Sequence, residues 1–354
     1  MLVYACISSH GYGHASRTAS VLSELAQQVP ECRLVISTAV DPAFLKLVMG
    51  HTPFELRSCR WDIGMLQANA LDLDLKSTLN ALEALEAELP AQVEAEACWL
   101  AEQPSQPLIL ADVPPSAALL AKRLVCPLIW LGNFGWDAIY RPLGGPFVPW
   151  ADLARERYGE GDLLLRCPLS LPMEWGISSV DVGFTSSTPR VDPGLVAQRL
   201  DLPLDRERCV LISFGGLGMA MDPNWLPLWP HHVFVGVDPV LLESGNGRLL
   251  PPDLRPLDVM PLTARMITKP GYSSFCEAFQ QGVGLHVVRR QGFAEAPVLE
   301  LGLKEEGWHR FLEEEAFRRG AWELDEPLVA PRAPRVNQDG SRQAAELLCR
   351  QLRR

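Results

Sequence analysis

Short apolar runs alternate with helix-patterned segments along this chain of 354 residues, and two of the runs lead into glycine-containing turns. Residues 2–7 (LVYACI) form the first of these two runs, and residues 209–216 (CVLISFGG) form the second. An apolar, β-rich run of this length is typical of a parallel strand covered on both faces. The alternation therefore predicts an α/β chain with two doubly wound parallel sheets in tandem.

The same pattern gives the expected elements. In the N-terminal half we expect strands at 2–7, 33–38, 108–112, 128–133 and 162–167, and helices at 15–28, 42–49, 76–103 and 117–124. In the C-terminal half we expect strands at 209–216, 232–237, 265–271 and 284–290, and helices at 273–281, 296–305 and 338–352. Residues 176–194 are rich in Ser, Thr, Gly and Pro and are predicted to be the linker. The expected domains are therefore 1–180 and 181–336.

Charge and cysteine content narrow the class of protein. The net charge of −11 provides no global basic field, so we expect no nucleic-acid partner. The nine cysteines are scattered and form no C-x-x-C pair, which favours a reduced protein without disulfides or zinc. The first apolar run is only six residues long and no charged segment precedes it. We therefore expect a cytoplasmic protein without a signal peptide or membrane span.

The turn at residues 8–14 (SSHGYGH) is the first candidate site, because ligands bind outside the carboxyl ends of parallel strands. Its glycines fit neither the G-x-G-x-x-G pattern nor a P-loop, and by themselves they indicate a tight turn as readily as a site. His10 and His14 shift the balance, because histidine titrates near neutrality and accepts protons from hydroxyls. Residues 213–218 (SFGGLG) repeat the glycine turn in the second half.

Several longer stretches carry a family resemblance. Residues 267–300 (ITKPGYSSFCEAFQQGVGLHVVRRQGFAEAPVLE) resemble the donor-site signature of GT-B nucleotide-sugar glycosyltransferases, in particular family 28, the peptidoglycan N-acetylglucosaminyltransferase relatives. Residues 10–17 (HGYGHASR) resemble the glycine-rich turn of that family. Residues 61–79, 109–140 and 162–173 resemble the glycosyltransferase-like N-terminal half of plant L-arabinokinase. The kinase half of that enzyme has no counterpart in the stretches matched, so sugar kinase activity is not implied.

The resemblance implies a GT-B fold, in which two Rossmann-like domains face each other across a cleft and the last helix, 337–354, packs back on the N-terminal domain. It implies inverting transfer of a hexosyl or N-acetylhexosaminyl group from a nucleoside-diphosphate sugar, with UDP expected, to a hydroxyl acceptor. No cofactor is expected. No D-x-D-like metal motif stands out, and Asp72 and Asp74 fit surface charge better. The implied donor-binding residues are Gly13, Gly215, Gly216, Lys269, Gly271, Tyr272, Ser273, Ser274, Glu277, Phe293, Ala294 and Glu295.

Within this set, the start of the helix after Gly271 has free amides that can hold phosphate. Glu277, one turn further, is expected to accept hydrogen bonds from ribose hydroxyls, although a carboxylate in a first helical turn is also favoured by the helix dipole alone. Ala296 stands where many relatives have Gln, which leaves the donor sugar open.

His14 is the expected general base and His10 the residue that orients a substrate; the competing assignment gives the base role to His10 or Asp137. Residues that follow apolar strands are expected on the acceptor side: Asp112, Asn133 and Trp136. Trp136 fits a buried position at least as well as a sugar-stacking one. Asp62 and Gln67 are further candidates for lining the same cleft.

Two other functions remain open from the sequence. One is a non-catalytic protein that binds a nucleotide sugar or sugar on a GT-B frame, and the other is a different GT-B reaction such as epimerisation of a sugar nucleotide. The acceptor class is equally open among small molecules, glycans and lipids. A lipid acceptor would bring peripheral membrane contact, which needs only a small apolar patch.

Overall fold

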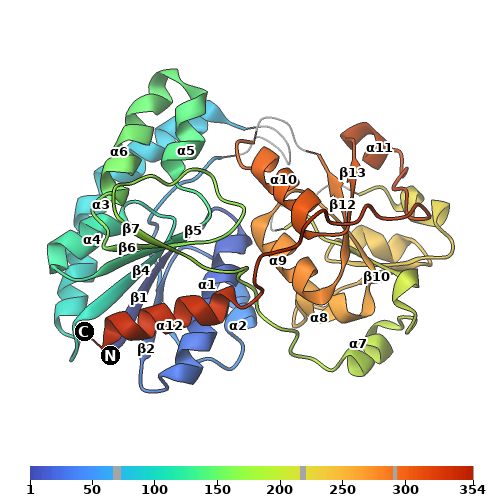
Figure 1. Cartoon of the computed structure of the whole chain (residues 1–354), viewed down its shortest axis with the longest axis horizontal. Helices are drawn as coiled ribbons and strands as arrows, with labels where there is room; N and C mark the ends of the chain where they lie inside the picture. The colour runs from blue at the N-terminus through green and yellow to red at the C-terminus, as the bar shows by residue number, and fades with distance from the viewer. Residues whose placement is uncertain (67–72, 216–220, 290–292, 354) are drawn as a thin grey trace. The chain divides into compact units, whose positions relative to one another are not determined.

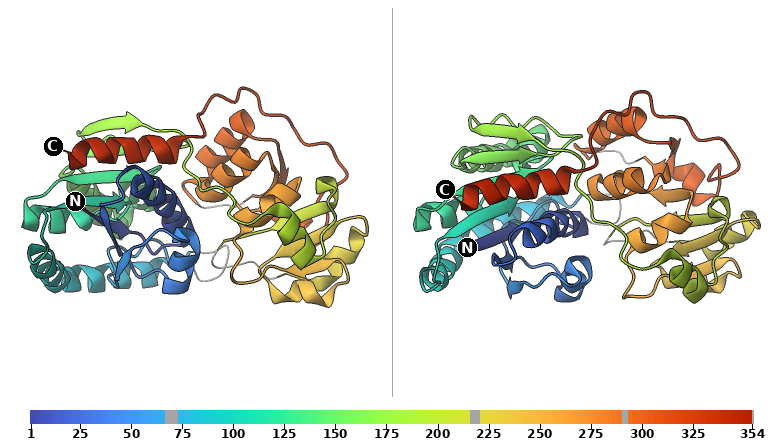
Figure 2. Two further views of the ribbon diagram at one scale, coloured as in Figure 1. Left: turned by 90° about the horizontal axis from the view of Figure 1, so that it is seen from below. Right: turned by 60° about the horizontal axis from the view of Figure 1, so that its bottom comes forward.

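The computed structural model, shown in Figures 1 and 2, describes residues 1–66, 73–215, 221–289 and 293–353. They divide into two units, one of Met1–Thr185 together with Asn337–Arg354 and one of Ser186–Val336. The chain passes from the first unit to the second after Thr185, which lies inside the predicted linker.

Within the described residues, the first unit contains a seven-stranded sheet in the order β3-β2-β1-β4-β5-β6-β7, with every neighbouring pair parallel. Its strands are β1 (Leu2–Ile7), β2 (Arg33–Ser37), β3 (Glu55–Arg57), β4 (Pro107–Asp112), β5 (Leu128–Gly132), β6 (Leu163–Arg166) and β7 (Ser178–Asp181). Strands β1, β4 and β5 are buried along their whole length. Burial on both faces explains why these strands were readable as continuous apolar runs.

The helices of the first unit lie on both faces of its sheet. They are α1 (Tyr12–Gln28), α2 (Pro42–Met49), α3 (Leu75–Ala101), α4 (Ala117–Leu124), α5 (Trp136–Tyr140), α6 (Val148–Tyr158) and α12 (Gly340–Leu352). Right-handed crossovers put α1 and α2 on one face and α3, α4 and α6 on the other. Helix α12, red in Figure 1, packs on α1, where Ser341 Oγ lies 2.7 Å from Ser20 Oγ.

The second unit repeats this construction. Its described residues form a six-stranded parallel sheet in the order β10-β9-β8-β11-β12-β13. The strands are β8 (Cys209–Ile212), β9 (Val233–Gly236), β10 (Gly247–Leu249), β11 (Arg265–Thr268), β12 (Gly284–Val288) and β13 (His309–Leu312). The helices are α7 (Pro193–Leu200), α8 (Pro256–Val259), α9 (Tyr272–Gln281), α10 (Ala296–Glu306) and α11 (Glu314–Arg318).

Each sheet has one point where the strand order reverses. In the first unit the chain runs outward from β1 to β3 and then returns to place β4 on the other side of β1. In the second unit the same reversal lies between β8 and β11. Ligands of doubly wound sheets bind beyond the carboxyl ends of the strands at this reversal. The segments that follow β1, β4, β8 and β11 are therefore the places to look for a site.

The observed elements differ from the sequence prediction at several places, of which the linker and the start of α1 are two. Residues 176–194 were expected to be irregular, yet Ser178–Asp181 form the edge strand β7. All four residues of β7 are exposed, so this strand has no apolar alternation to reveal it. Helix α1 begins at Tyr12 rather than at residue 15, which puts His14 in the first turn of a helix and not in a loop.

Candidate functional site

The turn between β1 and α1 is held at the reversal point of the first sheet. The Ser8 amide donates to the Asp112 carbonyl at 3.3 Å, which joins this turn to the end of β4. Gly11 precedes α1 with φ of 92°, a left-handed conformation that residues with a Cβ rarely adopt. The turn thus needs a glycine at this position, and it delivers the next residues directly into the helix.

His14 and Asp112 meet at this point, from the start of α1 and the end of β4. His14 Nδ1 lies 2.9 Å from Asp112 Oδ1, and His14 is 8% exposed whereas Asp112 is fully buried. Burial alone would raise the pKa of Asp112, but Arg17 and His14 lower it to about 2, so the carboxylate is ionised. Arg17 Nη2 also lies 3.1 Å from Nδ1, but the ionised oxygen is nearer and repels a nitrogen lone pair, so we assign the proton to Nδ1, which donates to Asp112. Nε2 of neutral His14 is then the proton acceptor.

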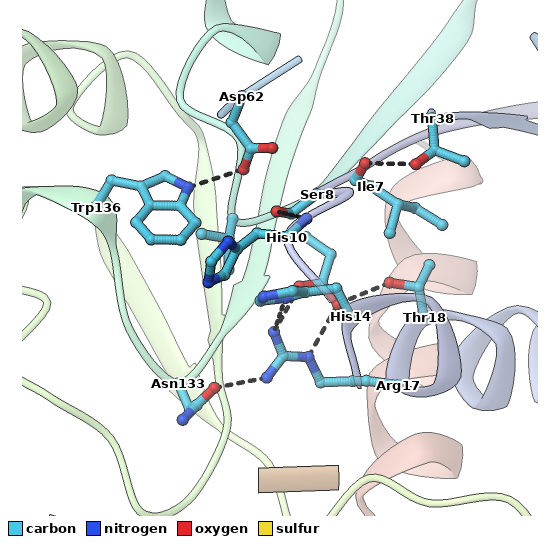
Figure 3. Close-up of polar contacts among 12 residues, drawn as sticks. Ile7, Ser8, His10, His14, Arg17, Thr18, Thr38, Asp62, Asn133 and Trp136 are labelled. Carbon is cyan, nitrogen blue, oxygen red and sulfur yellow. Dashed lines mark hydrogen bonds and ion pairs between the residues drawn. The ribbon is translucent and has the colours of Figure 1, made fainter. Parts of the chain in front are cut away.

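Two further residues of α1 donate hydrogen bonds to the carboxylate oxygens of Asp112. Arg17 donates from Nε to Oδ2 at 2.9 Å and from Nη2 to Oδ1 at 2.5 Å, and Thr18 Oγ1 donates to Oδ2 at 2.7 Å. Arg17 Nη1 also donates to Asn133 Oδ1 at 2.7 Å, as Figure 3 shows. Asp112 and Asn133 were expected on the acceptor side, but both side chains are buried in this network. They lie behind His14 and fix its orientation rather than presenting open groups.

His10 lies beside a second loop, residues 61–66. Its Nδ1 accepts a hydrogen bond from the Met65 amide at 3.3 Å, so the neutral ring carries its proton on Nε2. Gly64 has φ of 69°, and a Cβ there would lie 2.4 Å from the His10 ring. The Trp136 ring meets His10 edge-on, at 5.2 Å between ring centroids. This loop therefore closes on His10, and His10 is better placed to donate than to act as a base.

Trp136 is a buried residue rather than a stacking surface. It is 1% exposed, and its Nε1 donates to Asp62 Oδ2 at 2.8 Å. Asp62 comes from the loop that closes on His10, whereas Gln67 lies outside the described residues. The packing interpretation of Trp136 thus replaces the stacking one.

Asp137, the residue after Trp136 in α5, contacts other residues than those of the β1–α1 turn. Its Oδ2 accepts from Trp175 Nε1 at 3.1 Å and lies 3.9 Å from Arg155 Nη1. Burial raises the pKa of Asp137. Asp137 is 5% exposed, and these two partners lie on α6 and in the segment after β6 rather than at the β1–α1 turn. This geometry favours His14 over Asp137 as the base.

In the second unit, the predicted donor residues gather at the carboxyl ends of β8, β11 and β12. Gly215 follows β8 with φ of 74°, which fits the tight turn expected there. Gly216 lies outside the described residues. Lys269 follows β11, and Gly271 precedes α9 in extended conformation without a side chain that caps the helix. The first turn of α9 contains Tyr272, Ser273 and Ser274. The dipole and free N–H groups of such a helix start favour an anion.

Glu277 lies one turn into α9. In the described part of the chain its carboxylate has no side-chain hydrogen bond, and the Arg255–Asp258 ion pair lies close enough to act on it electrostatically. Burial raises the pKa of Glu277 to about 7, while Arg255 opposes this rise and Asp258 adds to it. A half-buried carboxylate without donors is suited to receive hydroxyl donors from a ligand.

The predicted sugar-contacting loop precedes α10. Phe293 and Ala294 are half-buried, and Glu295 is 7% exposed at the N-cap of α10, where its carbonyl accepts from the Leu299 amide at 3.1 Å. This loop continues from the end of β12, so it lies at the same edge of the sheet as the start of α9. Among the described residues, no group of three or more metal-ligating side chains is present. Nor is any described helix long and apolar enough to cross a membrane.

Comparisons with known proteins bear on the whole chain. No protein-family model matches it. Over 308 residues it is 26% identical to L-arabinokinase of Arabidopsis thaliana, a match that covers 84% of this chain. The chain spans 29% of the length of that enzyme. The sequence resemblance to L-arabinokinase is therefore confirmed, over a minor part of that protein.

Solved structures establish the fold. UGT89C1 of Arabidopsis thaliana superposes with a TM-score of 0.62 at 14% identity, covering 98% of this chain and 93% of that one. UGT71G1 of Medicago truncatula, complexed with UDP-glucose, gives 0.63 at 13% identity, with 98% and 93% covered. The glycotransferase of kitacinnamycin gives 0.62 at 16% identity, with 99% and 98% covered. The chain has the GT-B glycosyltransferase fold; the narrower likeness to family 28 stays a prediction.

Proposed function

We propose that this chain transfers a sugar from a UDP-sugar to a hydroxyl group of an acceptor. The observation that carries the proposal is the His14–Asp112 pair at the reversal point of the first sheet, in which a buried carboxylate leaves Nε2 of the imidazole as the proton acceptor. Two structures of the same fold support a UDP-sugar donor: UGT71G1 is complexed with UDP-glucose and UGT89C1 with UDP-L-rhamnose. UGT89C1 is also complexed with quercetin, a polyhydroxylated small molecule.

The proposed chemistry is a single displacement. His14 Nε2 takes the proton of the acceptor hydroxyl as its oxygen attacks the anomeric carbon, and the bond from that carbon to the diphosphate oxygen breaks with its electron pair going to the diphosphate. Asp112 stabilises the imidazolium that forms, because its carboxylate carries a negative charge and keeps accepting the hydrogen bond from Nδ1–H. Attack from the face opposite the leaving group inverts the anomeric configuration. His10 donates from Nε2 to a substrate oxygen.

The proposed donor site is the edge of the second sheet. The free N–H groups at the start of α9 and the Lys269 ammonium would meet the charge that develops on the leaving diphosphate. This neutralisation needs no metal ion, so metal-independent transfer is part of the proposal. Phe293, Ala294 and Glu295 would reach the sugar, and Glu277 the ribose. Transfer further requires the donor held by the second unit to reach His14 of the first.

Glu277→Ala is expected to weaken UDP binding by ~1–3 kcal/mol, the scale for losing hydrogen bonds to a charged group. The physical reason is that the ribose hydroxyls lose their carboxylate acceptor, while the phosphate contacts at the start of α9 remain. Isothermal titration of UDP into the purified chain measures this change. Glu305→Ala in α10, which breaks an exposed pairing with Arg332, is the control and should bind UDP like the parent. Equal UDP affinity of the parent and Glu277→Ala would contradict the proposal that Glu277 binds the ribose.

UDP affinity is also expected to fall with pH below about 7, because only ionised Glu277 accepts two hydroxyl donors and its pKa in the free protein is raised to about 7. The loss approaches roughly tenfold per pH unit down to the lower pKa of the complex. Glu277→Gln should lack this component, and comparing it with the parent cancels the titration of the terminal phosphate of UDP. The same variant should be more stable than the parent at pH 8, because ionising Glu277 above its unfolded pKa costs the folded state. Parallel pH profiles for the two proteins would refute the assignment.

A binding protein without transferase activity is the second candidate. The match to a segment of L-arabinokinase favours it, because there the similar residues belong to a protein named for a different reaction. Such a protein would bind UDP-sugars and release no UDP in the presence of acceptors. Release that depends on His14 separates the two candidates.

A further inference from the structure

Asp62 is buried without a full set of partners. The side chain is 5% exposed, and Oδ2 accepts from Trp136 Nε1 at 2.8 Å. Oδ1 is buried as well, yet no described residue gives it a hydrogen bond. Leaving a buried acceptor unsatisfied costs about 1–3 kcal/mol, more for a charged group. A carboxylate kept in this state needs an explanation other than folding stability.

The position of Asp62 supplies that explanation. It lies beside the β1–α1 turn, where the Ser8 hydroxyl and the Ser9 backbone act on its carboxylate as polar neighbours, although neither reaches Oδ1 with the geometry of a hydrogen bond. His14 is near enough for its charge to act on Asp62, and Figure 3 shows Asp62, Trp136 and His10 grouped on the same side of the turn. Burial raises the pKa of Asp62, and these neighbours partly oppose the rise. The carboxylate that holds the unsatisfied oxygen therefore lies on the His10 side of the turn that leads into α1, the helix whose first turn contains His14.

The local structure fixes this carboxylate rather than leaving it free to turn. The indole of Trp136 holds one oxygen, and Trp136 in turn stacks on Tyr140, whose hydroxyl donates to the Gly64 carbonyl at 3.1 Å. Asp62 and Trp136 also line a cavity of about 40 Å³, whose wall combines apolar side chains, four of them leucines, with the Glu86–Arg157 ion pair.

We propose that Asp62 Oδ1 accepts a hydrogen bond from a hydroxyl of a polyhydroxylated acceptor, next to the hydroxyl that His14 deprotonates. This inference rests on the proposed transfer reaction and names its acceptor class. The groups around the turn favour such a ligand, because the Ser9 hydroxyl, the two imidazoles and the carboxylate are all able to hydrogen-bond to polyols, whereas the Trp136 face is buried. A second hydroxyl would fix which oxygen of the acceptor faces His14 and so set the regiochemistry of transfer.

Asp62→Asn tests the proposal, because it keeps the shape and an oxygen for the Trp136 indole but turns the free acceptor into an N–H donor. Ligand-observed NMR with glycerol, D-glucose and myo-inositol as probes, and phenol as the probe without vicinal hydroxyls, measures acceptor binding directly. We expect at least one polyol to bind the parent and to lose binding 10-fold or more in Asp62→Asn. Asp62→Ser should show the same loss. Both variants should melt at or above the parent temperature, whereas a purely structural role for Asp62 would lower melting.

Separate titration of UDP into the same samples keeps this test distinct from that of the proposed function. UDP binding without polyol binding by the parent, or equal polyol binding by the parent and both variants, overturns the role of Asp62 and leaves the donor site in place. Polyol binding that depends on Asp62 without UDP binding overturns the transfer reaction and leaves the polyol site in place. Where transfer is measured, Asp62→Asn should raise the acceptor KM more than it lowers kcat.

Discussion

His14→Ala is expected to lower turnover of sugar transfer by ~10²–10⁴-fold, the usual contribution of a general base. The variant removes the Nε2 acceptor, and the buried Asp112 cannot replace it because Arg17 and Thr18 occupy its oxygens. UDP binding should change little, since the proposed donor residues belong to the second unit. Steady-state release of UDP from a UDP-sugar, with calorimetric UDP titration alongside, checks both parts.

The competing assignments are tested in the same assay. His10→Ala removes a donor whose ring accepts from the Met65 amide, and Asp137→Asn neutralises a carboxyl held by Trp175. Both should lose less turnover than His14→Ala. Turnover of His14→Ala equal to that of the parent would return the β1–α1 turn to the simpler interpretation of a polar connection shaped by its glycines.

Asp112→Ala is expected to destabilise the first unit by ~3–5 kcal/mol, because it leaves the Arg17 cation buried without its carboxylate. The Arg17 side chain is 2% exposed, and it also donates to Asn133, a neutral acceptor that cannot balance its charge. The stabilising pair should persist in acid. Its contribution is complete above the unfolded pKa of Asp112, near 3.8, and is lost as the pH falls through the folded pKa of about 2. Urea unfolding followed by circular dichroism gives the change, read on the transition of the first unit.

A matched control comes from the exposed pair Arg141–Asp152, whose Nη2–Oδ1 distance of 2.5 Å equals that of Arg17–Asp112. Asp152→Ala should cost only ~0–1 kcal/mol, since both side chains are half exposed. Similar losses in the two variants would mean that burial does not set the strength of the Arg17–Asp112 pair. Failure of Asp112→Ala to accumulate as folded protein would agree with the prediction.

The sequence predicted those elements whose pattern is set by burial on both faces of a sheet. Strands β1 and β4 and helix α4 were placed to within a residue, because continuous apolar runs and a regular amphipathic stripe mark them. The edge strands β3, β7, β10 and β13 were not predicted. They are three or four residues long, and none is fully buried, so hydrophobic periodicity carries no signal for them.

The site was predicted in part. His14 and Asp112 were both singled out, because each follows a buried strand, but nothing in the sequence showed that they pair across 98 positions. Asp112 was therefore assigned to the acceptor rather than to His14. Arg17 and Thr18 received no role. Their spacing of three and four residues from His14 on α1 places them on the same helix face, and this was the available signal.

The measurement that tests the central claim most directly is isothermal titration of UDP into the full chain at pH 8, with the parent and Glu277→Ala side by side. It needs neither the acceptor nor the donor sugar. The account predicts saturable, one-site binding with a Kd within roughly 1 µM–1 mM, the range of typical enzyme KM values, and weaker binding to the variant. No saturable heat from UDP in the parent at ligand concentrations above roughly 1 mM would contradict the proposal that this GT-B chain uses a UDP-sugar.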